Sequence, residues 1–320
     1  MKLPRKMEIE SVVGTLLVLY VLYMLFFGGY HLIRPSTKGE KILERASIPY
    51  PAVIAHRGAS SVAPESTVPA YRIAMEQGAD YLEADIQRTK DGRLVVFHDK
   101  SLQRTTDVEN KFPARKNDYV SSFTLEEIEQ LDNGSWFNNK YPLRARQEYA
   151  DLKVLTLDKL LEMSEEEGKS TGIVLDVKVD ERNVGIVDDI VELLHKHGKI
   201  SNSEDSFAGL IVFSFDLNIL KRFKELAPGI PRVLLIDRNR ISRRQWDAWL
   251  NMAADYVHGI GVKGFVSWPW HIAKAHDRNL FVFPYVIKEL WHLRIMAHLK
   301  SSGYITNRPD MVAKFLQVVP

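Results

Sequence analysis

The 320-residue sequence contains no cysteine. Disulfide bonds, thiolate metal sites and lipidated cysteines are therefore excluded, although this absence does not fix the compartment. The chain also lacks a strong net charge, because 43 Lys and Arg offset 41 Asp and Glu to give +2. The basic residues are scattered, and the nearest thing to a cluster, Arg238, Arg240, Arg243 and Arg244, is typical of a solvated helix start. We therefore expect no nucleic-acid partner.

Long apolar runs are also scarce, and the clearest one lies near the N-terminus. Residues 11–33 carry no formal charge and are rich in Leu, Val, Tyr and Phe. At about 1.5 Å per residue, a helix of this length spans a hydrocarbon core of roughly 30 Å. A cleaved signal peptide is the alternative, since Lys2, Arg5 and Lys6 precede the run, but no small-x-small cleavage site is obvious after Phe27. The sequence predicts an uncleaved, single-pass N-terminal membrane anchor.

The side of the membrane on which the rest of the chain lies is left open. The anchor has basic residues on both flanks, so the positive-inside bias is small. These residues are Lys2, Arg5 and Lys6 before the run and Arg34, Lys38, Lys41 and Arg45 after it. An apolar fraction of 45% and a charged fraction of 26% suit one large soluble domain. We expect residues 1–45 to form the anchor and a linker, and residues 46–320 to form that domain.

Polar side chains collect at the ends of short apolar runs between residues 53 and 99. His56 and Arg57 end one run, Glu83 and Asp85 lie within a second, and His98 ends a third. A helical pattern from Pro69 to Gly78 separates the first two runs, so strands and helices alternate. In parallel α/β folds the groups that do chemistry lie beyond the carboxyl ends of the strands. His56, Glu83, Asp85 and His98 should therefore converge.

The residue types point to phosphate chemistry with a metal. Glu83 and Asp85 are two residues apart on a strand, so their carboxylates project to one face and can share a hard cation. Imidazole titrates near neutral pH, so one of His56 and His98 can take a proton from a nucleophile while the other gives one to a leaving oxygen. Arg57 offers a bidentate fork that suits a phosphate.

The motifs resemble those of the glycerophosphodiester phosphodiesterase family, within the phospholipase C-like phosphodiesterase superfamily. The family pattern of HR, PEN, ExD and HD is matched here by HR at 56–57, PES at 64–66, ExD at 83–85 and HD at 98–99. The resemblance covers roughly residues 50 to 315. Further matching pieces are LQRTTD at 102–107, SWF at 135–137, VLTLDKLL at 154–161, LDVK at 175–178, SFD at 214–216 and ITNRPD at 305–310.

The resemblance implies a (β/α)₈ TIM barrel of the α/β class, with a small insertion after the third strand at about residues 103–150. The hydrophobic pattern independently gives eight strand candidates, separated by helical patterns such as 184–197 and 218–226. The stretch 107–149 is irregular and too long for an ordinary loop, which fits the insertion. The strand candidates are the three runs described above and residues 173–177, 210–213, 233–236, 256–260 and 280–285.

The resemblance also assigns roles to individual residues. It makes His56 and His98 the acid/base pair, with base and acid left open between them, Arg57 a phosphate ligand, and Glu83 and Asp85 ligands of one divalent cation, Mg²⁺ or Ca²⁺. At the fourth strand the family usually has Glu-x-Lys. Here Asp176 takes the position of a third metal ligand, and Lys178 follows as a point charge for the phosphate.

Two positions depart from the family pattern. Ser66 replaces the Asn of the PEN triplet, and a hydroxyl cannot bridge two partners as an amide does. Glu65 is retained and is expected either to support the metal or to orient His56. After the last expected strand, the usual aromatic-Thr-Val-Asn run is replaced by residues 285–288, where Tyr285 keeps an aromatic ring for stacking on the substrate.

Together these features predict a membrane-anchored, metal-dependent phosphoric diester hydrolase. The expected substrates are glycerophosphodiesters or lysophospholipids, with glycerol 3-phosphate or lysophosphatidic acid as products, formed either by water or through a cyclic phosphate. Phe265, Val266, Trp268, Pro269 and Trp270 follow a strand candidate and are expected at a lipid interface, around an acyl chain, or packed on the barrel top. Alternatives are a phospholipase D-like enzyme acting on intact or sphingoid lipids, and a non-catalytic barrel that binds phospholipid head groups.

Overall fold

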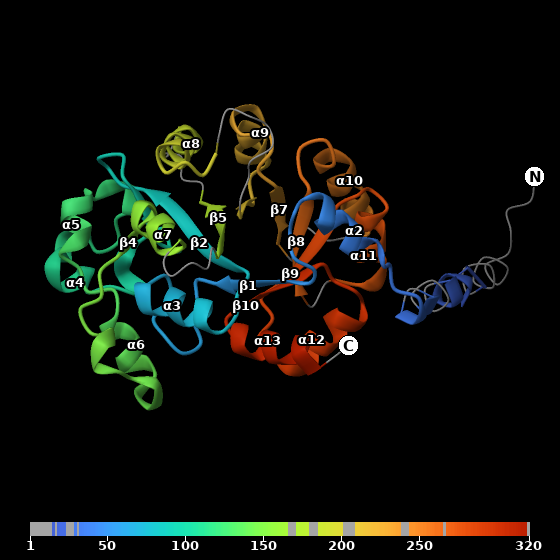
Figure 1. Cartoon of the computed structure of the whole chain (residues 1–320), viewed down its shortest axis with the longest axis horizontal. Helices are drawn as coiled ribbons and strands as arrows, with labels where there is room; N and C mark the ends of the chain where they lie inside the picture. Colours follow the sequence, from blue (N-terminus) through green and yellow to red (C-terminus); the bar gives the residue numbers. More distant parts are fainter. Residues whose placement is uncertain are drawn as a thin grey trace, which may run out of the picture.

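A computed structural model gives the architecture of the chain (Figure 1). The structure describes residues 15–16, 18–23, 29–30, 32–165, 171–178, 185–200, 209–237, 243–264 and 267–318. Of the expected basic cluster, Arg238 and Arg240 lie outside these residues, while Arg243 is the first residue of helix α10 (Arg243–Ala253). Phe265 and Val266 of the expected aromatic loop also lie outside.

Strands and helices alternate along most of the described chain. The strands are β1 (Ala52–His56), β2 (Tyr81–Arg88), β3 (Leu94–Val96), β4 (Leu155–Thr156), β5 (Gly172–Val177), β6 (Leu210–Ser214), β7 (Arg232–Ile236), β8 (Gly259–Lys263), β9 (Phe281–Tyr285) and β10 (Gly303–Thr306). The α-helices are α2 (Lys38–Arg45), α3 (Val68–Glu76), α4 (Val108–Lys111), α5 (Leu125–Glu129), α6 (Ser135–Lys140), α7 (Leu157–Met163), α8 (Ile186–Lys196), α9 (Leu217–Leu226), α10 (Arg243–Ala253), α11 (Pro269–His276), α12 (Leu290–His298) and α13 (Pro309–Val318).

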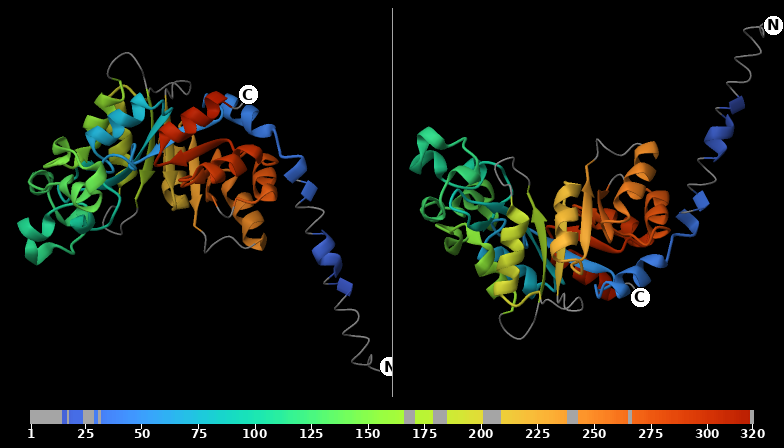
Figure 2. Two further views of the ribbon diagram at one scale, coloured as in Figure 1. Left: turned by 90° about the horizontal axis from the view of Figure 1, so that it is seen from below. Right: turned by 90° about the horizontal axis from the view of Figure 1, so that it is seen from above.

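Eight of these strands form a parallel barrel in the order β10-β1-β2-β5-β6-β7-β8-β9. The ring closes between β9 and β10, where Ile287 N donates to Ile305 O at 2.8 Å and Ser302 N to Val282 O at 3.0 Å. Helices surround the strands (Figure 2). The expected (β/α)₈ barrel is confirmed.

The barrel interior is apolar, and its N-terminal end is closed by the segment that precedes β1. Inward-facing side chains such as Ile54, Val174 and Phe283 are buried together in one cluster. Leu43 of α2 belongs to the same cluster and is fully buried, as is most of Ile48 just after the helix. Burial of these side chains removes apolar surface from water at the bottom of the barrel and leaves its opposite end for the polar site.

The third expected strand, residues 94–97, is present as β3. The prediction that it belongs to the barrel is wrong. β3 pairs antiparallel with β2, and β4 pairs antiparallel with β3. Only five residues connect β2 to β3, and Thr89 N donates to Arg93 O around a tight turn in which Gly92 has a φ of +80°. A parallel neighbour would need a crossover of a dozen or more residues. The Asp-Gly pair in this turn was the sequence signal for a hairpin.

The eighth barrel strand was missed. This strand is β10, which is four residues long and too short to show a clear hydrophobic periodicity in the sequence. The insertion therefore follows the second barrel strand and begins with β3. It runs through short helical turns around their own core, which includes Phe97, Leu102 and Phe123, before the chain returns to the barrel at β5.

Of the expected membrane span, residues 11–33, about half lies outside the described residues. Within the part of the chain that the structure describes, no helix combines the length and the apolarity needed to cross a bilayer. The described fragments of this span are helical, and they point away from the barrel (Figures 1 and 2). The span therefore stays a prediction.

Candidate active site

The polar residues expected to converge do meet, at the carboxyl ends of the barrel strands. His56 ends β1, Glu83 and Asp85 lie on β2, and Asp176 lies on β5. His98 reaches the same place from the turn after β3, because β3 pairs with the C-terminal residues of β2, Ile86 to Arg88. These side chains, with Arg57, Lys178 and Tyr285, line a cavity of about 180 Å³.

Three buried carboxylates form a candidate metal centre in this cavity. The ligand oxygens of Glu83, Asp85 and Asp176 lie within 4.8 Å of one another. The register of the parallel pair explains this, because Asp85 and Asp176 are direct partners across β2 and β5. Asp176 Oδ1 is buried and has no hydrogen-bond partner among the described residues. An all-oxygen donor set with an unsatisfied buried oxygen fits a hard divalent cation such as Mg²⁺ or Ca²⁺.

Without a cation, burial of these carboxylates is costly. Burial raises the pKa of Glu83 well above its ordinary value, and the negative charges of Asp85 and Asp176 raise it further. Burial also raises the pKa of Asp176. For Asp85, burial acts in the same direction, but the positive charges of Lys178 and Arg57 outweigh it and lower the pKa. The positive charges of Lys178 and Arg57 are therefore too few for all three carboxyl groups to ionise at their ordinary pKa values.

Two cations compensate Asp85. Lys178 Nζ lies 2.8 Å from Asp85 Oδ1 and also pairs with Asp176, and Arg57 Nε lies 3.1 Å from Asp85 Oδ2. Burial works against the charged form of Lys178, yet the carboxylates of Asp85 and Asp176 raise its pKa overall. Lys178 is therefore a permanently charged group between the carboxylates and the cavity.

The backbone after β1 is bent to present His56 and Arg57. Arg57 has a φ of +58°, and its N–H donates to Glu83 Oε2 at 2.8 Å. Gly58 follows with a φ of +79°, and a Cβ there would lie 2.6 Å from the backbone of Ala70. Only glycine fits such a close approach at positive φ, so the HRG sequence has a structural reason. His56 Nδ1 is held at 2.7 Å from Asn307 Oδ1.

A second network holds His98 through charged side chains. His98 Nδ1 lies 2.5 Å from Asp99 Oδ1, and Arg104 Nε donates to Asp99 Oδ2 at 2.5 Å. Arg104 also donates from both Nη atoms to Glu65, at 2.7 and 3.0 Å, and Glu65 accepts from Arg57 Nη1 at 2.8 Å. A chain of ion pairs therefore connects Arg57, which follows His56, to Asp99, which holds His98.

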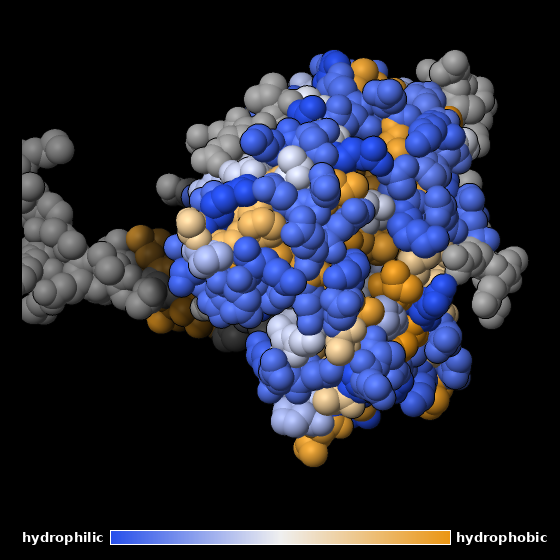
Figure 3. Space-filling model, turned by 90° about the vertical axis from the view of Figure 1, so that its left-hand side faces the viewer, coloured by the Kyte–Doolittle hydropathy of each residue, from blue (hydrophilic) through white to orange (hydrophobic). Residues whose placement is uncertain are grey.

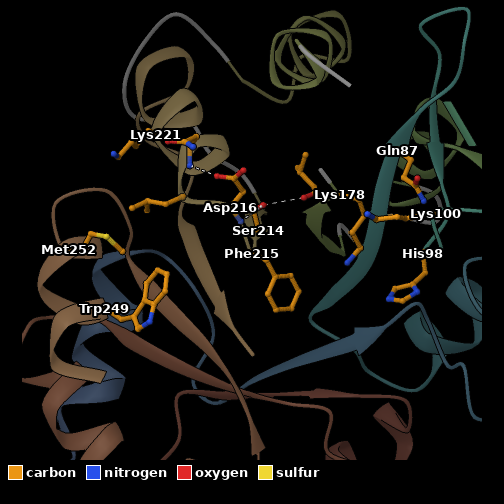
Figure 4. A pocket seen from close by; sticks show the side chains of 13 residues that line it. Gln87, His98, Lys100, Lys178, Ser214, Phe215, Asp216, Lys221, Trp249 and Met252 are labelled. Carbon is orange, nitrogen blue, oxygen red and sulfur yellow. Dashed lines mark hydrogen bonds between the residues drawn. The ribbon is translucent and has the colours of Figure 1, made fainter. Parts of the chain in front are cut away.

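A larger groove of about 740 Å³ adjoins the cavity and shares His98, Lys178 and Phe215 with it (Figure 4). Phe215 lies in the middle of this groove, with His98 on one side and Trp249 and Met252 on the other (Figure 4). Phe215 and Met252 are 41% and 46% exposed, so their apolar surface is accessible to a ligand. His98 lines both spaces, whereas His56 lines only the smaller one.

All nine residues singled out in the sequence lie in or beside this site. Glu65 was expected to support the metal or to orient His56, and its observed partners are two arginines. Glu65 binds Arg57 and Arg104, and is thus a positioning residue for arginines. Tyr285 lines the cavity, donates from its hydroxyl to Ile236 O at 3.0 Å and packs edge-on against Phe215. Trp268 is half-exposed at the start of α11, where its ring stacks on Trp270.

Sequence reasoning missed the groups that orient the histidines. Asn307 and Arg104 lay within the matched ITNRPD and LQRTTD pieces, but received no role. Gln87 was also missed; its amide donates to Phe97 O at 2.6 Å and Asp99 O at 2.8 Å, which fixes the turn that carries His98. Its position on β2, two residues after Asp85, was the available signal.

Comparison with known proteins decides the family. A profile described as the glycerophosphoryl diester phosphodiesterase family matches residues 56–311, which include every residue of the site. The chain belongs to this family. It is accordingly an enzyme of the phosphoric diester hydrolase class, and the expected resemblance is confirmed.

Two relatives agree with this assignment, and two solved structures share the fold. A glycerophosphodiester phosphodiesterase of Bacillus subtilis is 31% identical over 261 residues, 82% of this chain and 85% of the relative. One from Caldanaerobacter subterraneus subsp. tengcongensis is 31% identical over 265 residues, 83% and 97% of the two chains. An Oleispira antarctica phosphodiesterase, solved with the product sn-glycerol-3-phosphate, has a TM-score of 0.68 at 24% identity and covers 84% of this chain and 97% of its own. A structure from Agrobacterium tumefaciens has a TM-score of 0.61 at 23% identity, covering 82% and 99%.

The raised pKa of Glu83 predicts that cation binding releases a proton. Because the carboxyl holds its proton more tightly in the metal-free site, Mg²⁺ or Ca²⁺ must displace that proton, and affinity should rise with pH. Isothermal titration in two buffers of different ionisation enthalpy should report proton release when the cation binds.

Glu83→Gln should bind the cation more weakly and release no proton, since the amide cannot ionise. Asp188→Asn is the matched control. Asp188 lies on α8, is exposed and pairs with Arg222 of α9. A wild-type affinity that does not change with pH, together with no proton release, would contradict this reading of the carboxylate group.

Proposed function

We propose that this chain is a divalent-cation-dependent phosphodiesterase that hydrolyses glycerophosphodiesters to glycerol 3-phosphate and an alcohol, with His56 as general base and His98 as general acid. The observation that carries the proposal is one cavity lined by both histidines, three carboxylates and two fixed cations. A barrel that only bound a head group would have no need of two oriented imidazoles beside a metal centre.

His56 suits the role of base. Asn307 Oδ1 lies next to its Nδ1, which favours the tautomer that carries a proton on Nδ1 and leaves Nε2 free to accept one. Burial, followed by the positive charge of Arg57, lowers the pKa of His56 to about 3, so the ring is neutral at physiological pH. A neutral ring with a free Nε2 can take the proton of the attacking hydroxyl.

His98 suits the role of acid. Burial alone would raise the pKa of Asp99, but hydrogen bonds from His98 and Arg104 outweigh it and lower the pKa, so Asp99 is ionised. The Asp99 carboxylate lies 2.5 Å from His98 Nδ1 and fixes the orientation of the ring. Since His98 also lines the larger groove, its other nitrogen can protonate an alkoxide that departs into that groove.

The two roles balance over the reaction. A hydroxyl oxygen attacks phosphorus while His56 takes its proton, the bond from phosphorus to the alcohol oxygen breaks, and His98 gives that oxygen a proton. Arg57 and Lys178 would hold the phosphoryl oxygens and stabilise the charge that grows on them. A divalent cation held by Glu83, Asp85 and Asp176 would add Lewis-acid stabilisation of the same oxygens.

The two spaces suggest how a substrate lies. The cavity of about 180 Å³ is small and charged, which suits a glycerol phosphate, and the groove of about 740 Å³ accepts a larger group. Its apolar side chains Phe215, Leu217, Trp249 and Met252 also suit an acyl chain. This observation favours lysophospholipids as the second candidate substrates, with lysophosphatidic acid as the product.

We also propose that residues 11–33 anchor the enzyme in a membrane as a single-pass helix. Ten apolar or aromatic side chains in the described fragments of this segment are exposed by 47% or more, with Ile33 at 81%. Exposure of apolar side chains on every face is unfavourable in water but suits lipid. The fragments run away from the barrel (Figure 2), and their end contacts the domain where His298 of α12 bonds to the backbone oxygen of Leu32.

The acid/base assignment predicts how the histidine variants respond to the leaving group. On glycerophosphocholine, whose leaving alkoxide needs a proton, His98→Ala should lower kcat/KM by about 10²- to 10⁴-fold. On the p-nitrophenyl diester of glycerol phosphate, whose leaving group needs no proton, most of that loss should disappear. His56→Ala should be equally impaired on both substrates, as measured by steady-state kinetics with Mg²⁺ or Ca²⁺.

His197→Ala is the control for these variants, because His197 is remote from the cavity and pairs with Asp158. If the better leaving group rescued His56→Ala instead, the two roles would be reversed. If glycerophosphocholine were not hydrolysed by the wild-type enzyme with either cation, the proposed activity itself would be wrong.

The anchor makes a separate prediction. Full-length protein expressed in bacteria should sediment with membranes, resist extraction at alkaline pH and dissolve only in detergent. Leu19→Arg combined with Leu22→Arg should shift it to the soluble fraction, because each Arg disfavours insertion by about 2.5–3.5 kcal/mol at the helix centre. Leu143→Arg, at a fully exposed position of the insertion, is the control and should stay in the membrane. Release of the wild-type protein by alkaline washing would contradict a spanning helix.

A further inference from the structure

Helix α12 has an apolar outer face. Leu290, Trp291 and Ile295 are 39%, 51% and 45% exposed, while Leu293 and Met296 on the inner face are buried. A barrel helix normally turns polar residues outward. Single exposed apolar residues need no explanation, but three on one face of a nine-residue helix form a patch.

A fourth exposed apolar side chain, the aromatic Trp268, extends this patch. Trp268, at the start of α11, is 52% exposed and stacks on Trp270 with ring centroids 5.3 Å apart. The starts of α11 and α12 are neighbours, because a Cβ on Gly264, after β8, would lie 2.3 Å from the ring of His292 in α12. We call Trp268, Leu290, Trp291 and Ile295 the α12 face.

The α12 face continues into the N-terminal apolar segment. His298, in the last turn of α12, bonds through Nε2 to the backbone oxygen of Leu32 at 2.9 Å. Leu32 and Ile33 end the expected membrane span and are 47% and 81% exposed. The described fragments of that span leave the molecule on the side of α11 and α12, opposite the insertion (Figures 1 and 2).

The charges around the α12 face are mainly positive. Lys288, Arg294 and Lys300 are exposed, against the single exposed carboxylate of Glu289 between residues 288 and 300. Tryptophan side chains concentrate at the boundary between lipid and water, and Lys and Arg near a bilayer are attracted to anionic head groups. The same combination would be less suited to a protein partner, whose contact core is depleted of charge.

We propose that the α12 face lies on the surface of an anionic lipid bilayer when the chain is anchored. This inference rests on the proposed anchor, which brings Leu32 and therefore the end of α12 to the membrane surface. The side of the barrel then rests on lipid, and the mouth near Tyr285 opens beside the bilayer, where lipid-derived diesters are released. The face on the insertion side is mainly hydrophilic and points into water (Figure 3).

Because the chain has no cysteine, a single spin label can test this surface. Full-length Ile295→Cys is labelled with a nitroxide and reconstituted in vesicles of phosphatidylcholine and phosphatidylglycerol. Leu143→Cys, 103% exposed on the insertion, and Val318→Cys, 81% exposed at the end of α13, are matched controls. Relaxation by oxygen and by a water-soluble nickel complex then reports whether each label faces lipid or water.

The proposal predicts several-fold lower access of the nickel complex, and higher access of oxygen, at position 295 than at positions 143 and 318. If the protein floats with the vesicles but the label at 295 is as water-accessible as that at 143, the anchor stands and the α12 face is not a lipid surface. Spin-spin coupling between labels at 295 would identify a second copy of the chain as the partner and overturn the proposal. Failure to float would overturn the anchor and this inference together.

Discussion

The rest of the site depends on one electrostatic constraint, the burial of three carboxylates at adjacent strand ends. Glu83, Asp85 and Asp176 are placed within reach of one another by the register of β2 and β5, and mutual repulsion would push such groups apart in a less rigid frame. The barrel holds them because their backbones are locked in a closed parallel sheet. Lys178 and Arg57 offset part of the charge, and a hard cation would offset the remainder.

The geometry of the histidines follows from the same arrangement. Glu83 accepts the N–H of Arg57, which turns the chain after β1 so that the His56 side chain lies over the cavity. Arg57 then contacts Glu65, and Glu65 binds Arg104, which holds Asp99 beside His98. The insertion thus contributes to the site through Arg104 and Asp99, since it carries the charges that position His98 at the edge of the groove.

Much of this could be predicted from the sequence, because the informative residues lie at the ends of apolar runs. His56, Glu83, Asp85 and His98 converge as the alternating pattern predicts, and the helical patterns before Gly78 and at 184–197 and 218–226 are helices α3, α8 and α9. The hydrophobic periodicity gave a wrong prediction where a strand is too short to show its place in the fold. A three-residue strand such as β3 has the same pattern in a hairpin as in a barrel, and only the short Asp-Gly turn distinguishes them. Asn307 and Gln87 escaped notice because amides that orient a histidine depend on contacts distant in sequence, which no local pattern encodes.

The central claim is that the metal centre and the two histidines together cleave one particular phosphorus–oxygen bond. Phosphorus NMR of the full-length protein with glycerophosphocholine and Mg²⁺ or Ca²⁺ tests this claim most directly. The account predicts a growing signal of glycerol 3-phosphate that stops when the cation is chelated and resumes when it is restored. Formation of phosphocholine, or turnover that is unchanged by chelation, would contradict it.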